Sequence, residues 1–520
     1  MTIYLNTNIA LENYKELIRS KYFVDKSQII DKFNDLIGTS ECHVCITKPR
    51  RFGKTSIINM LGAYYTKGYN SKDIFDKLNI SKSKAYMENL NKHNVINISL
   101  SNLPDKMNSY NDYINGIRKS IINDIKEKYP KINVEKFFSI AHMLYATGEK
   151  FIFLIDEWDY IFSHNLFKEN QNDFLEFLRN LLKDRPYVEF CYMTGVLPLK
   201  KYSESSSLNM FYEYTMLNDY VYDNYFGFTE DEVKDLCKKN KQISFEEISE
   251  WYNGYLTEHG ERIYNPVSVT SALRDNYCRS YWTRTGRQDE VLIYLKYNID
   301  DVCDDVIKMI NNIPVRVKIK KEYSAGQDAP KTRKEIYSAM ITYGFLTYYN
   351  GTIRIPNKEL MKEFEKALKD EAFGEVMTIV KNSSNMLKAT LNKDTETMEK
   401  IINDIHNSEI PILQYNDENS LSCVVTLAYL SARNEYKIEC EEKTGKGYAD
   451  FMFHPRKKNG TAIILELKKD DKVEKAINKI KEKDYSMKFI KENKGRKILA
   501  VGICYNSKTR EHECKIEELN

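Results

Sequence analysis

An apolar stretch that runs directly into Gly-Lys-Thr constrains this chain more than any other feature of its sequence. His43–Thr47 has the composition of a buried strand, Lys48–Thr55 reads K-P-R-R-F-G-K-T, and a helical pattern begins at Ser56. A strand, a glycine-containing loop and a helix in this order are typical of a phosphate-binding P-loop. The sequence therefore predicts a nucleotide-binding α/β domain built around this loop.

The residue types in this loop suit a triphosphate. Gly53 lets the backbone approach a phosphate because it has no Cβ, and the free N–H groups at the start of the next helix attract an anion. Lys54 is placed to reach the β- and γ-phosphates, and Thr55 to put its hydroxyl on Mg²⁺. We expect ATP and Mg²⁺ as cofactors. The residues expected to bind them here are Arg51, Phe52, Gly53, Lys54, Thr55 and Ser56.

Two features of the loop leave an alternative open. The standard loop begins with a glycine five residues before Gly53, and this chain has Lys48 at that position. A basic turn between a strand and a helix is therefore the alternative interpretation. Arg50 and Arg51 either stabilise transition-state charge or contact a partner, or they belong to a solvated basic turn.

A second apolar run supports the P-loop interpretation. Phe151–Ile155 suits a central strand of a parallel sheet that is covered on both faces, and it ends at Asp156 and Glu157. Carboxylates at this end of a strand lie where ligands bind in open α/β sheets. We predict that Asp156 holds Mg²⁺, directly or through water. Glu157 is then the general base that orients the attacking water.

A third strand ends at a small polar residue. Val188–Gly195 is rich in apolar and aromatic side chains and has Thr194 before its final glycine. In ATPases of this build, a residue at this place often contacts the γ-phosphate or the attacking water. Thr194 is therefore a candidate sensor, and the alternative is a threonine that only caps the strand.

Composition limits the class of protein. A chain of 520 residues is too long for one core, and roughly two to four domains are expected. Its 78 Lys and Arg against 75 Asp and Glu leave a net charge of +3, so no global basic field indicates nucleic acid, although a local patch remains open. No apolar run suits a membrane span, and the N-terminus does not resemble a secretory signal. We expect a cytoplasmic protein with no membrane partner.

The cysteines point to packing rather than to metal binding. Cys42 and Cys45 form a C-x-x-C, but no second pair completes a zinc site. Alternation along a strand would point the two side chains to opposite faces. We expect buried free thiols in a reducing compartment.

The middle of the chain has shorter segments. Thr229 and Glu232 have the spacing of a capping box at a helix start. The aromatic, turn-rich stretch Glu250–Tyr255 indicates either a packed subdomain or a contact surface. Asn350-Gly351 between two β-rich stretches predicts a tight hairpin. Helices followed by a hairpin suggest a winged-helix-like module, which binds DNA in some proteins and serves as a lid or packing domain in others.

A second candidate site lies near the C-terminus. Lys446–Phe453 alternates like a strand, and Thr461–Lys468 reads as its partner after a turn. Glu466 and Lys468 share a face because they are two residues apart, and pairing would bring Asp450 beside them. We predict that Asp450 and Glu466 bind Mg²⁺, which activates water, and that Lys468 stabilises charge on phosphorus or positions the nucleophile. The alternative is a plain hairpin with a surface Asp and a Glu–Lys pair.

Taken together, these stretches resemble bacterial and fungal proteins that fuse an AAA-ATPase-like domain to a C-terminal PD-(D/E)XK nuclease-superfamily domain. The resemblance runs over nearly the whole chain, and the missing first glycine of the loop is normal for that family. The stretches that carry it are Tyr22–Ser27, Lys48–Thr55, Leu154–Glu157, Thr194-Gly195, Trp251–Tyr255, Tyr264–Pro266, Tyr281-Trp282, Ile355–Glu359, Gly445–Asp450, Glu466–Lys468 and Ala476–Tyr485.

The resemblance implies an α/β fold in three parts. It implies a P-loop, AAA-like core with a parallel sheet over residues 1–225 and a helical lid with a winged-helix-like region over 226–385. It also implies an α/β restriction-endonuclease-like domain over 386–520. The segment around Asp25 and Lys26 would lie near the adenine or at the start of the ATPase domain.

Three residues depart from the family pattern. Trp158 stands where tyrosine is usual, Lys479 stands where the family tends to have glutamine, and Lys443 stands where an acidic residue is usual. The nuclease-type residues Asp450, Glu466 and Lys468 are present, whereas their surroundings are altered. The resemblance therefore implies the nuclease fold more firmly than it implies nuclease activity.

Three functions fit these features. The first is an ATP-regulated, Mg²⁺-dependent nuclease that cleaves DNA or RNA, with DNA as the favoured partner. The second is a non-catalytic ATP-dependent switch whose C-terminal fold is a scaffold. The third is a nucleic-acid-binding ATPase that uses the winged-helix-like segment and binds in a salt-sensitive manner. A homo-oligomer is compatible with all three, because AAA-type enzymes often work as rings, but the sequence assigns no arginine that acts on a neighbouring subunit.

Overall fold

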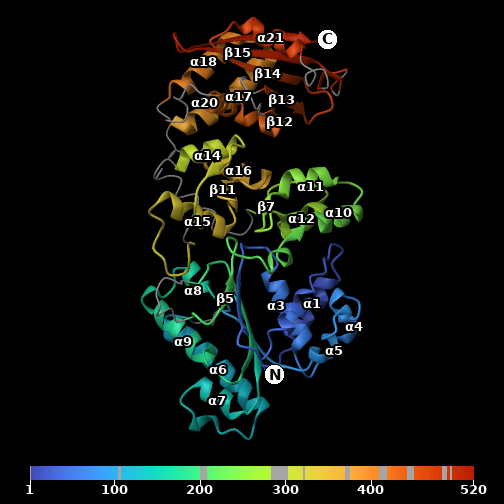
Figure 1. Cartoon of the computed structure of the whole chain (residues 1–520), viewed down its shortest axis with the longest axis vertical. Helices are drawn as coiled ribbons and strands as arrows, with labels where there is room; N and C mark the ends of the chain where they lie inside the picture. Colours follow the sequence, from blue (N-terminus) through green and yellow to red (C-terminus); the bar gives the residue numbers. More distant parts are fainter. Residues whose placement is uncertain are drawn as a thin grey trace. The chain divides into compact units, whose positions relative to one another are not determined.

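The computed structural model divides the chain into two units, each with a five-stranded sheet (Figure 1). The N-terminal unit comprises Met1–Val291 and Arg316–Leu360, and the C-terminal unit comprises Leu292–Val315 and Met361–Asn520. The bounds of the three domains expected from the sequence, 1–225, 226–385 and 386–520, remain a prediction. The structure describes residues 2–102, 107–199, 208–282, 302–319, 322–368, 375–408, 418–441, 450–482, 489–491, 493 and 495–519.

Parallel strands form the large sheet of the N-terminal unit, in the order β2-β3-β4-β1-β5. The three strands expected from the sequence are confirmed as β1, β3 and β4. Because the strands are parallel, their carboxyl ends meet at one edge of the sheet, where ligands bind in this class of fold. The strands are β1 (His43–Thr47), β2 (Asn94–Ser99), β3 (Phe151–Asp156), β4 (Val188–Gly195) and β5 (Tyr212–Tyr214).

Helices cover both faces of this sheet. Phe153 of β3 belongs to an apolar cluster with Ile117 of α6 and Leu178 of α9. Leu154 points to the opposite face, toward Gly62 of α3, where the absence of a Cβ leaves room for α1. The helices are α1 (Ile9–Ile18), α2 (Ile29–Asn34), α3 (Lys54–Tyr65), α4 (Lys72–Phe75), α5 (Tyr86–Asn89), α6 (Tyr110–Lys128), α7 (Ile140–Ala146), α8 (Tyr160–Ser163) and α9 (Gln171–Leu182).

A smaller group of helices and short strands follows the large sheet. The predicted capping box is confirmed, since Thr229 and Glu232 each accept the other's backbone N–H at the start of α10. Asn265 caps α12 differently, since its side-chain oxygen accepts the backbone N–H groups of Val267 and Ser268, and Pro266 occupies the first turn. These elements are β6 (Phe228–Thr229), α10 (Glu230–Lys238), α11 (Phe245–Tyr252), β7 (Tyr255–Leu256), β8 (Arg262–Tyr264) and α12 (Pro266–Asp275).

The predicted hairpin is also confirmed. Strands β10 (Thr347–Tyr349) and β11 (Thr352–Arg354) pair antiparallel, and Asn350 and Gly351 between them have φ of 48° and 75°. Two positive φ values are what a tight two-residue hairpin turn requires. Helix α15 (Arg333–Tyr343) precedes the hairpin and α16 (Lys358–Ala367) follows it.

The C-terminal unit has a mixed sheet in the order β12-β13-β14-β15-β16. Strands β14 and β15 are parallel, with α21 between them in the chain, and the other neighbours are antiparallel. The predicted strand from residue 446 is described only from Asp450 on. The elements are α14 (Val302–Ile310), β9 (Val315–Arg316, at the junction of the units), α17 (Glu375–Asn392), α18 (Thr395–His406), α20 (Glu418–Ala428), β12 (Tyr436–Glu441), β13 (Asp450–Pro455), β14 (Ala462–Lys469), α21 (Val473–Glu482), β15 (Ile498–Asn506) and β16 (Glu511–Leu519).

The fold class expected from the sequence is therefore confirmed: a parallel α/β sheet, a largely helical middle region and a mixed C-terminal sheet. Cys42 and Cys45, beside and within β1, are buried free thiols as expected. Within the described ranges, no helix combines the length and the apolar character needed to cross a bilayer.

Candidate nucleotide-binding site and nuclease-like hairpin

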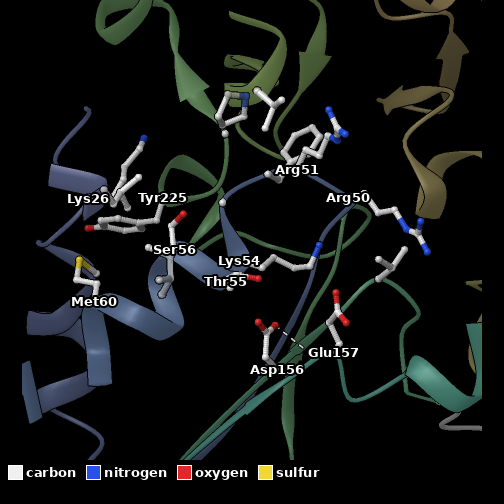
Figure 2. A pocket seen from close by; sticks show the side chains of 18 of the residues that line it. Lys26, Arg50, Arg51, Lys54, Thr55, Ser56, Met60, Asp156, Glu157 and Tyr225 are labelled. Atoms are coloured by element: carbon white, nitrogen blue, oxygen red, sulfur yellow. Dashed lines mark hydrogen bonds between the residues drawn. The ribbon is translucent and has the colours of Figure 1, made fainter. Parts of the chain in front are cut away.

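A cavity of about 630 Å³ lies at the carboxyl ends of β1 and β3 (Figure 2). Its walls include the P-loop from Arg50 to Ser56 and the carboxylates that follow β3. In Figure 2, Met60, Tyr225 and Lys26 lie on the opposite side of Thr55 from Asp156. The cavity thus has one side of charged and loop residues and another that is largely apolar and aromatic, which is the general make-up of a small-molecule site.

Gly53 gives the P-loop its shape. It has φ of 89° and stands immediately before the first residue of α3. A Cβ at this position would meet nothing within 4 Å, so glycine is favoured for its backbone conformation rather than for lack of space. The first turn of α3 contains no acidic residue, and its free N–H groups are suited to an anion.

The Lys54 side chain is folded back into the loop. Its ammonium donates hydrogen bonds to the carbonyl oxygens of Lys48 and Pro49, both at 2.8 Å. Burial lowers the pKa of Lys54 to about 8, although the carboxylates of Asp156, Asp159 and Glu157 favour its charged form. A buried ammonium held by two neutral carbonyls would gain from a phosphate, which supplies opposite charge.

Asp156 and Thr55 form the candidate magnesium position. Burial raises the pKa of Asp156 to about 6, while a hydrogen bond from the Thr55 hydroxyl and the charge of Lys54 lower it. A desolvated carboxylate beside a hydroxyl supplies the oxygen ligands that Mg²⁺ prefers, so the residues present fit the ion. Glu157 is exposed, and its N–H donates to Asp156 Oδ1 at 3.0 Å. Its φ of 51° is unusual for a non-glycine residue and is typical of functional positions.

Affinity for the magnesium–nucleotide complex is expected to weaken as the pH falls through about 6, because the Asp156 carboxyl then takes up a proton and loses its charge. Lys54, with a pKa of about 8, becomes more fully charged over the same range. This gain opposes the loss of charge on the terminal phosphate of ATP, which has a pKa of about 6, so affinity should fall less in EDTA than with Mg²⁺. ATP affinity measured from neutral to mildly acidic pH, with Mg²⁺ and with EDTA, tests this difference. Parallel profiles in the two conditions would contradict it.

Lys48, at the position of the missing glycine, has a structural task. Its side chain is 3% exposed, and its ammonium forms an ion pair with Asp219 at 2.8 Å and donates to the carbonyl of Thr215 at 2.8 Å. This buried pair ties the loop to the segment that follows β5. This pair was not predictable from the sequence, because the partners lie far apart in the chain and neither belongs to a recognised motif.

The two loop arginines differ in their surroundings. Arg51 has φ of 68°, and its guanidinium donates to the carbonyl of Tyr281 at 3.2 Å. In Figure 2 its side chain points away from Thr55 and Asp156. Arg50 and Arg51 both line the cavity. The Phe52 ring is buried and packs edge-on against Tyr255 at 5.0 Å between centroids, so it anchors the loop through its side chain.

Thr194 is the predicted nucleotide-site residue that does not line the cavity. It is fully buried, and its hydroxyl donates to the carbonyl of Ile46 in β1 at 2.9 Å. This hydrogen bond corresponds to the structural alternative, and the sensor role remains a prediction. The neighbouring Gly195 does line the cavity, and a Cβ there would collide with Asp159 and Trp158.

The apolar wall of the cavity was not foreseen from the sequence. It includes Tyr14, Phe23, Met60 and Tyr225, and the rings of Tyr14 and Phe23 meet edge-on at 6.3 Å. Lys26 also lines the cavity, and a place near the adenine for its segment remains a prediction. The one sequence sign was the stretch Tyr22–Ser27, whose residues have no motif chemistry of their own.

The C-terminal hairpin brings the nuclease-type residues into register. Asp450 of β13 is the direct antiparallel partner of Glu466 of β14. The Lys468 ammonium lies 3.2 Å from Glu466 Oε1, which confirms that these two side chains share a face. Lys479 of α21 forms a second ion pair with the same oxygen, and the Glu466 side chain is 0% exposed. A buried carboxylate is thus neutralised from two elements.

The described part of this arrangement does not by itself form a site for a divalent cation. Among the side chains that the structure describes, no group of three or more His, Cys, Asp or Glu is placed to hold a metal, and two ammonium groups lie against Glu466. The Asp450 side chain and the whole of Lys443 lie outside the described residues. Magnesium binding by Asp450 and Glu466 therefore remains a prediction.

Fold and site together define an α/β nucleotide-binding type of protein with a second, nuclease-like sheet, and comparison with known proteins gives the same two parts. The family model described as predicted AAA-ATPase matches residues 8–204, and that of the PD-(D/E)XK nuclease superfamily matches residues 416–515. The chain therefore joins a predicted AAA-ATPase domain to a PD-(D/E)XK nuclease-superfamily domain, which is the fusion that its sequence indicated.

Other comparisons add little. Among solved structures, the Walker-type ATPase PABY2304 of Pyrococcus abyssi is similar over 65% of this chain and 94% of its own length, with 12% sequence identity and a TM-score of 0.35. No curated protein matches this chain at a significant level.

Proposed function

We propose that this chain binds ATP with Mg²⁺ and hydrolyses it. The observation that carries the proposal is the cavity of about 630 Å³ in which Gly53, Lys54 and Thr55 face Asp156 and Glu157. Its second wall, of tyrosine, phenylalanine and methionine side chains, suits a nucleotide base. A cavity with a charged wall and an aromatic wall suits a ligand that has phosphates at one end and a flat ring at the other.

The residues would divide the work as follows. The free N–H groups before and within the first turn of α3 receive the phosphates, and Lys54 exchanges its two carbonyl partners for phosphate oxygens. Thr55 and Asp156 would hold Mg²⁺, which neutralises phosphate charge when bound. Glu157 accepts a proton from the attacking water and orients it.

We further propose that the nucleotide state regulates cleavage of nucleic acid, DNA rather than RNA, by the C-terminal unit. The support is the PD-(D/E)XK nuclease-superfamily match over residues 416–515, together with the register that places Asp450 opposite Glu466. Lys468 is positioned beside that carboxylate, where it can stabilise charge on phosphorus.

One observation favours a second candidate. Lys479 of α21 forms an ion pair with Glu466 in addition to that of Lys468, which opposes metal binding at that carboxylate. A chain whose nuclease fold is silent would act as an ATP-dependent switch or as a nucleic-acid-binding ATPase. ATP turnover without cleavage of DNA or RNA, with any divalent metal, would identify this case.

The proposal is tested most directly by Glu157→Gln. The variant is expected to keep magnesium–ATP affinity within about threefold of wild type and to lose turnover about 100-fold or more, because the base is removed while the binding groups stay. Turnover and ATP affinity are measured on one preparation, with DNA and RNA cleavage measured in parallel with and without ATP.

Glu135→Gln is the matched control, since Glu135 is an exposed carboxylate of the same unit and does not line the cavity. Wild-type turnover in Glu157→Gln would contradict the assigned role. Absence of ATP binding by wild type would contradict the proposed function itself.

A further inference from the structure

A buried carboxylate at the start of α16 binds the backbone that contacts the P-loop, without lining the cavity itself. Glu359 lies in the first turn of α16 and is 1% exposed. Its Oε1 accepts the backbone N–H groups of Tyr281 and Trp282, at 2.6 and 2.8 Å, and its Oε2 accepts the hydroxyl of Ser268 at 2.8 Å. Such a carboxylate fixes whatever backbone it binds, because an unpaired buried donor is costly.

The backbone that Glu359 fixes is the one that holds the P-loop. The carbonyl of Tyr281 accepts the hydrogen bond from the Arg51 guanidinium, at 3.2 Å. Burial disfavours the charge of Arg51 and lowers its pKa, and the charge of Glu359 opposes this effect. Arg51 stands two residues before Gly53 with φ of 68°, a conformation that persists in a non-glycine residue only where the surroundings hold it.

The same region packs directly against the loop. A Cβ on Gly344, which ends α15, would collide with the Pro49 side chain of the loop. The Tyr255 hydroxyl donates to the Gly344 carbonyl at 2.8 Å, and the Tyr255 ring meets Phe52. Several stretches to which the sequence assigned no chemistry therefore pack behind the loop. We call this region the cradle, and its contacting residues are Tyr255, Tyr281, Gly344 and Glu359.

The chain leaves the N-terminal unit directly after parts of this cradle. Leu360, the last residue of the unit's second segment, follows Glu359, and α16 continues to Ala367. Trp282, whose N–H donates to Glu359, is the last described residue before Val291, where the first segment of the N-terminal unit ends. Glu359 therefore connects the backbone that contacts the P-loop to the first turn of α16.

We propose that Glu359 is a positioning residue of the nucleotide site, acting on the P-loop through Tyr281 and Arg51, and that this contact makes α16 respond to the bound nucleotide. The inference rests on the proposed function and adds to it a route by which the nucleotide affects the rest of the chain. The stretches Tyr281-Trp282 and Ile355–Glu359 would then serve to position the P-loop. Glu359 itself belongs to the N-terminal unit, whereas α16 continues past Leu360 into the C-terminal unit.

Glu359→Ala tests the positioning role, and Glu359→Gln separates charge from hydrogen bonding. We expect Glu359→Ala to weaken ATP binding about tenfold, which is the order expected for loss of one charge-assisted link, with a smaller change in kcat. Glu359→Gln keeps acceptors for the N–H groups and can still pair with Ser268, so its loss should be intermediate. Glu250→Gln is the matched control, because Glu250 pairs with Lys358, the residue next to Glu359.

A double-mutant cycle shows whether the effect passes through the loop. If Glu359 acts through Arg51, the variant Arg51→Ala/Glu359→Ala should bind ATP no more weakly than Arg51→Ala alone. Additive losses, or ATP affinity in Glu359→Ala equal to that of the control, would overturn the inference. Should Glu359→Ala fail to fold, the cycle is run with Glu359→Gln, for which the same two outcomes decide.

Hydrogen exchange reports the response of α16. A non-hydrolysable ATP analogue should slow exchange over residues 358–368 in wild type and leave it unchanged in Glu359→Gln or Glu359→Ala. No change in wild type that demonstrably binds the analogue would overturn the inference alone. Wild type that binds no nucleotide would overturn the proposed function and this inference together, so the two failures are distinguished in one titration.

Discussion

Lys54→Ala is expected to lower ATP turnover about 100-fold or more, the scale found when a preorganised electrostatic partner of a transition state is removed. The Lys54 ammonium is buried, and its two hydrogen-bond acceptors are neutral carbonyl oxygens, which stabilise its positive charge less than an anion would. Phosphate oxygens offer a stronger, charge-assisted bond. Turnover and ATP affinity should therefore both fall, and neither can be recovered by raising Mg²⁺.

Two controls separate chemistry from folding. Lys72→Ala removes a lysine from the same unit that is exposed and paired with Asp76, and it should leave turnover unchanged. Unfolding temperature without nucleotide checks whether the carbonyls of Lys48 and Pro49 tolerate loss of their donor. Full turnover by a folded Lys54→Ala would remove the basis for placing phosphates at this loop.

Much of this site follows from local sequence. Apolar runs define β1 and β3, and parallel strands bring their carboxyl ends to one edge, so the meeting of Gly53, Lys54 and Thr55 with Asp156 was predictable. The hairpin turn at Asn350-Gly351 followed from turn chemistry alone. In each case the residues that make the structure are neighbours in the chain or belong to a strand that a short pattern identifies.

What was not predictable depends on partners far apart in sequence. The pairs Lys48–Asp219 and Arg51–Tyr281 join distant segments, and no local pattern encodes either contact. Thr194 illustrates a second limit of prediction from sequence, which concerns the direction of a side chain rather than the place of its residue. Its place at the end of β4 was predicted, whereas the direction of its hydroxyl, toward Ile46, depends on the neighbouring strand.

The C-terminal hairpin shows the same division. Strand alternation predicts that Glu466 and Lys468 share a face, and register places Asp450 opposite Glu466. The second ammonium comes from α21, and the sequence marked Lys479 only as a departure from the family pattern. The structure shows that the Lys479 ammonium lies against Glu466, because α21 packs beside β14.

Lys479→Gln is expected to raise the affinity of the C-terminal site for a divalent cation about tenfold, the order expected for removal of one like charge close to a cation site. Glu466 is buried, so the charges beside it are poorly screened by solvent, and one ammonium fewer leaves its carboxylate more available. Mn²⁺ binding, followed by metal-dependent change in unfolding temperature, measures this without relying on activity. Lys475→Gln is the matched control, because Lys475 lies on the same helix but is exposed and paired with Asp471.

If the C-terminal unit is a nuclease that Lys479 restrains, Lys479→Gln should also increase Mg²⁺-dependent cleavage, and Lys468→Ala in that background should abolish it. Equal Mn²⁺ affinity in wild type, Lys479→Gln and the control would show that Lys479 does not restrain a metal site. Raised affinity without any cleavage would favour the ATP-dependent switch, since a nuclease fold that binds its metal and still cuts nothing has lost more than the charge balance at Glu466.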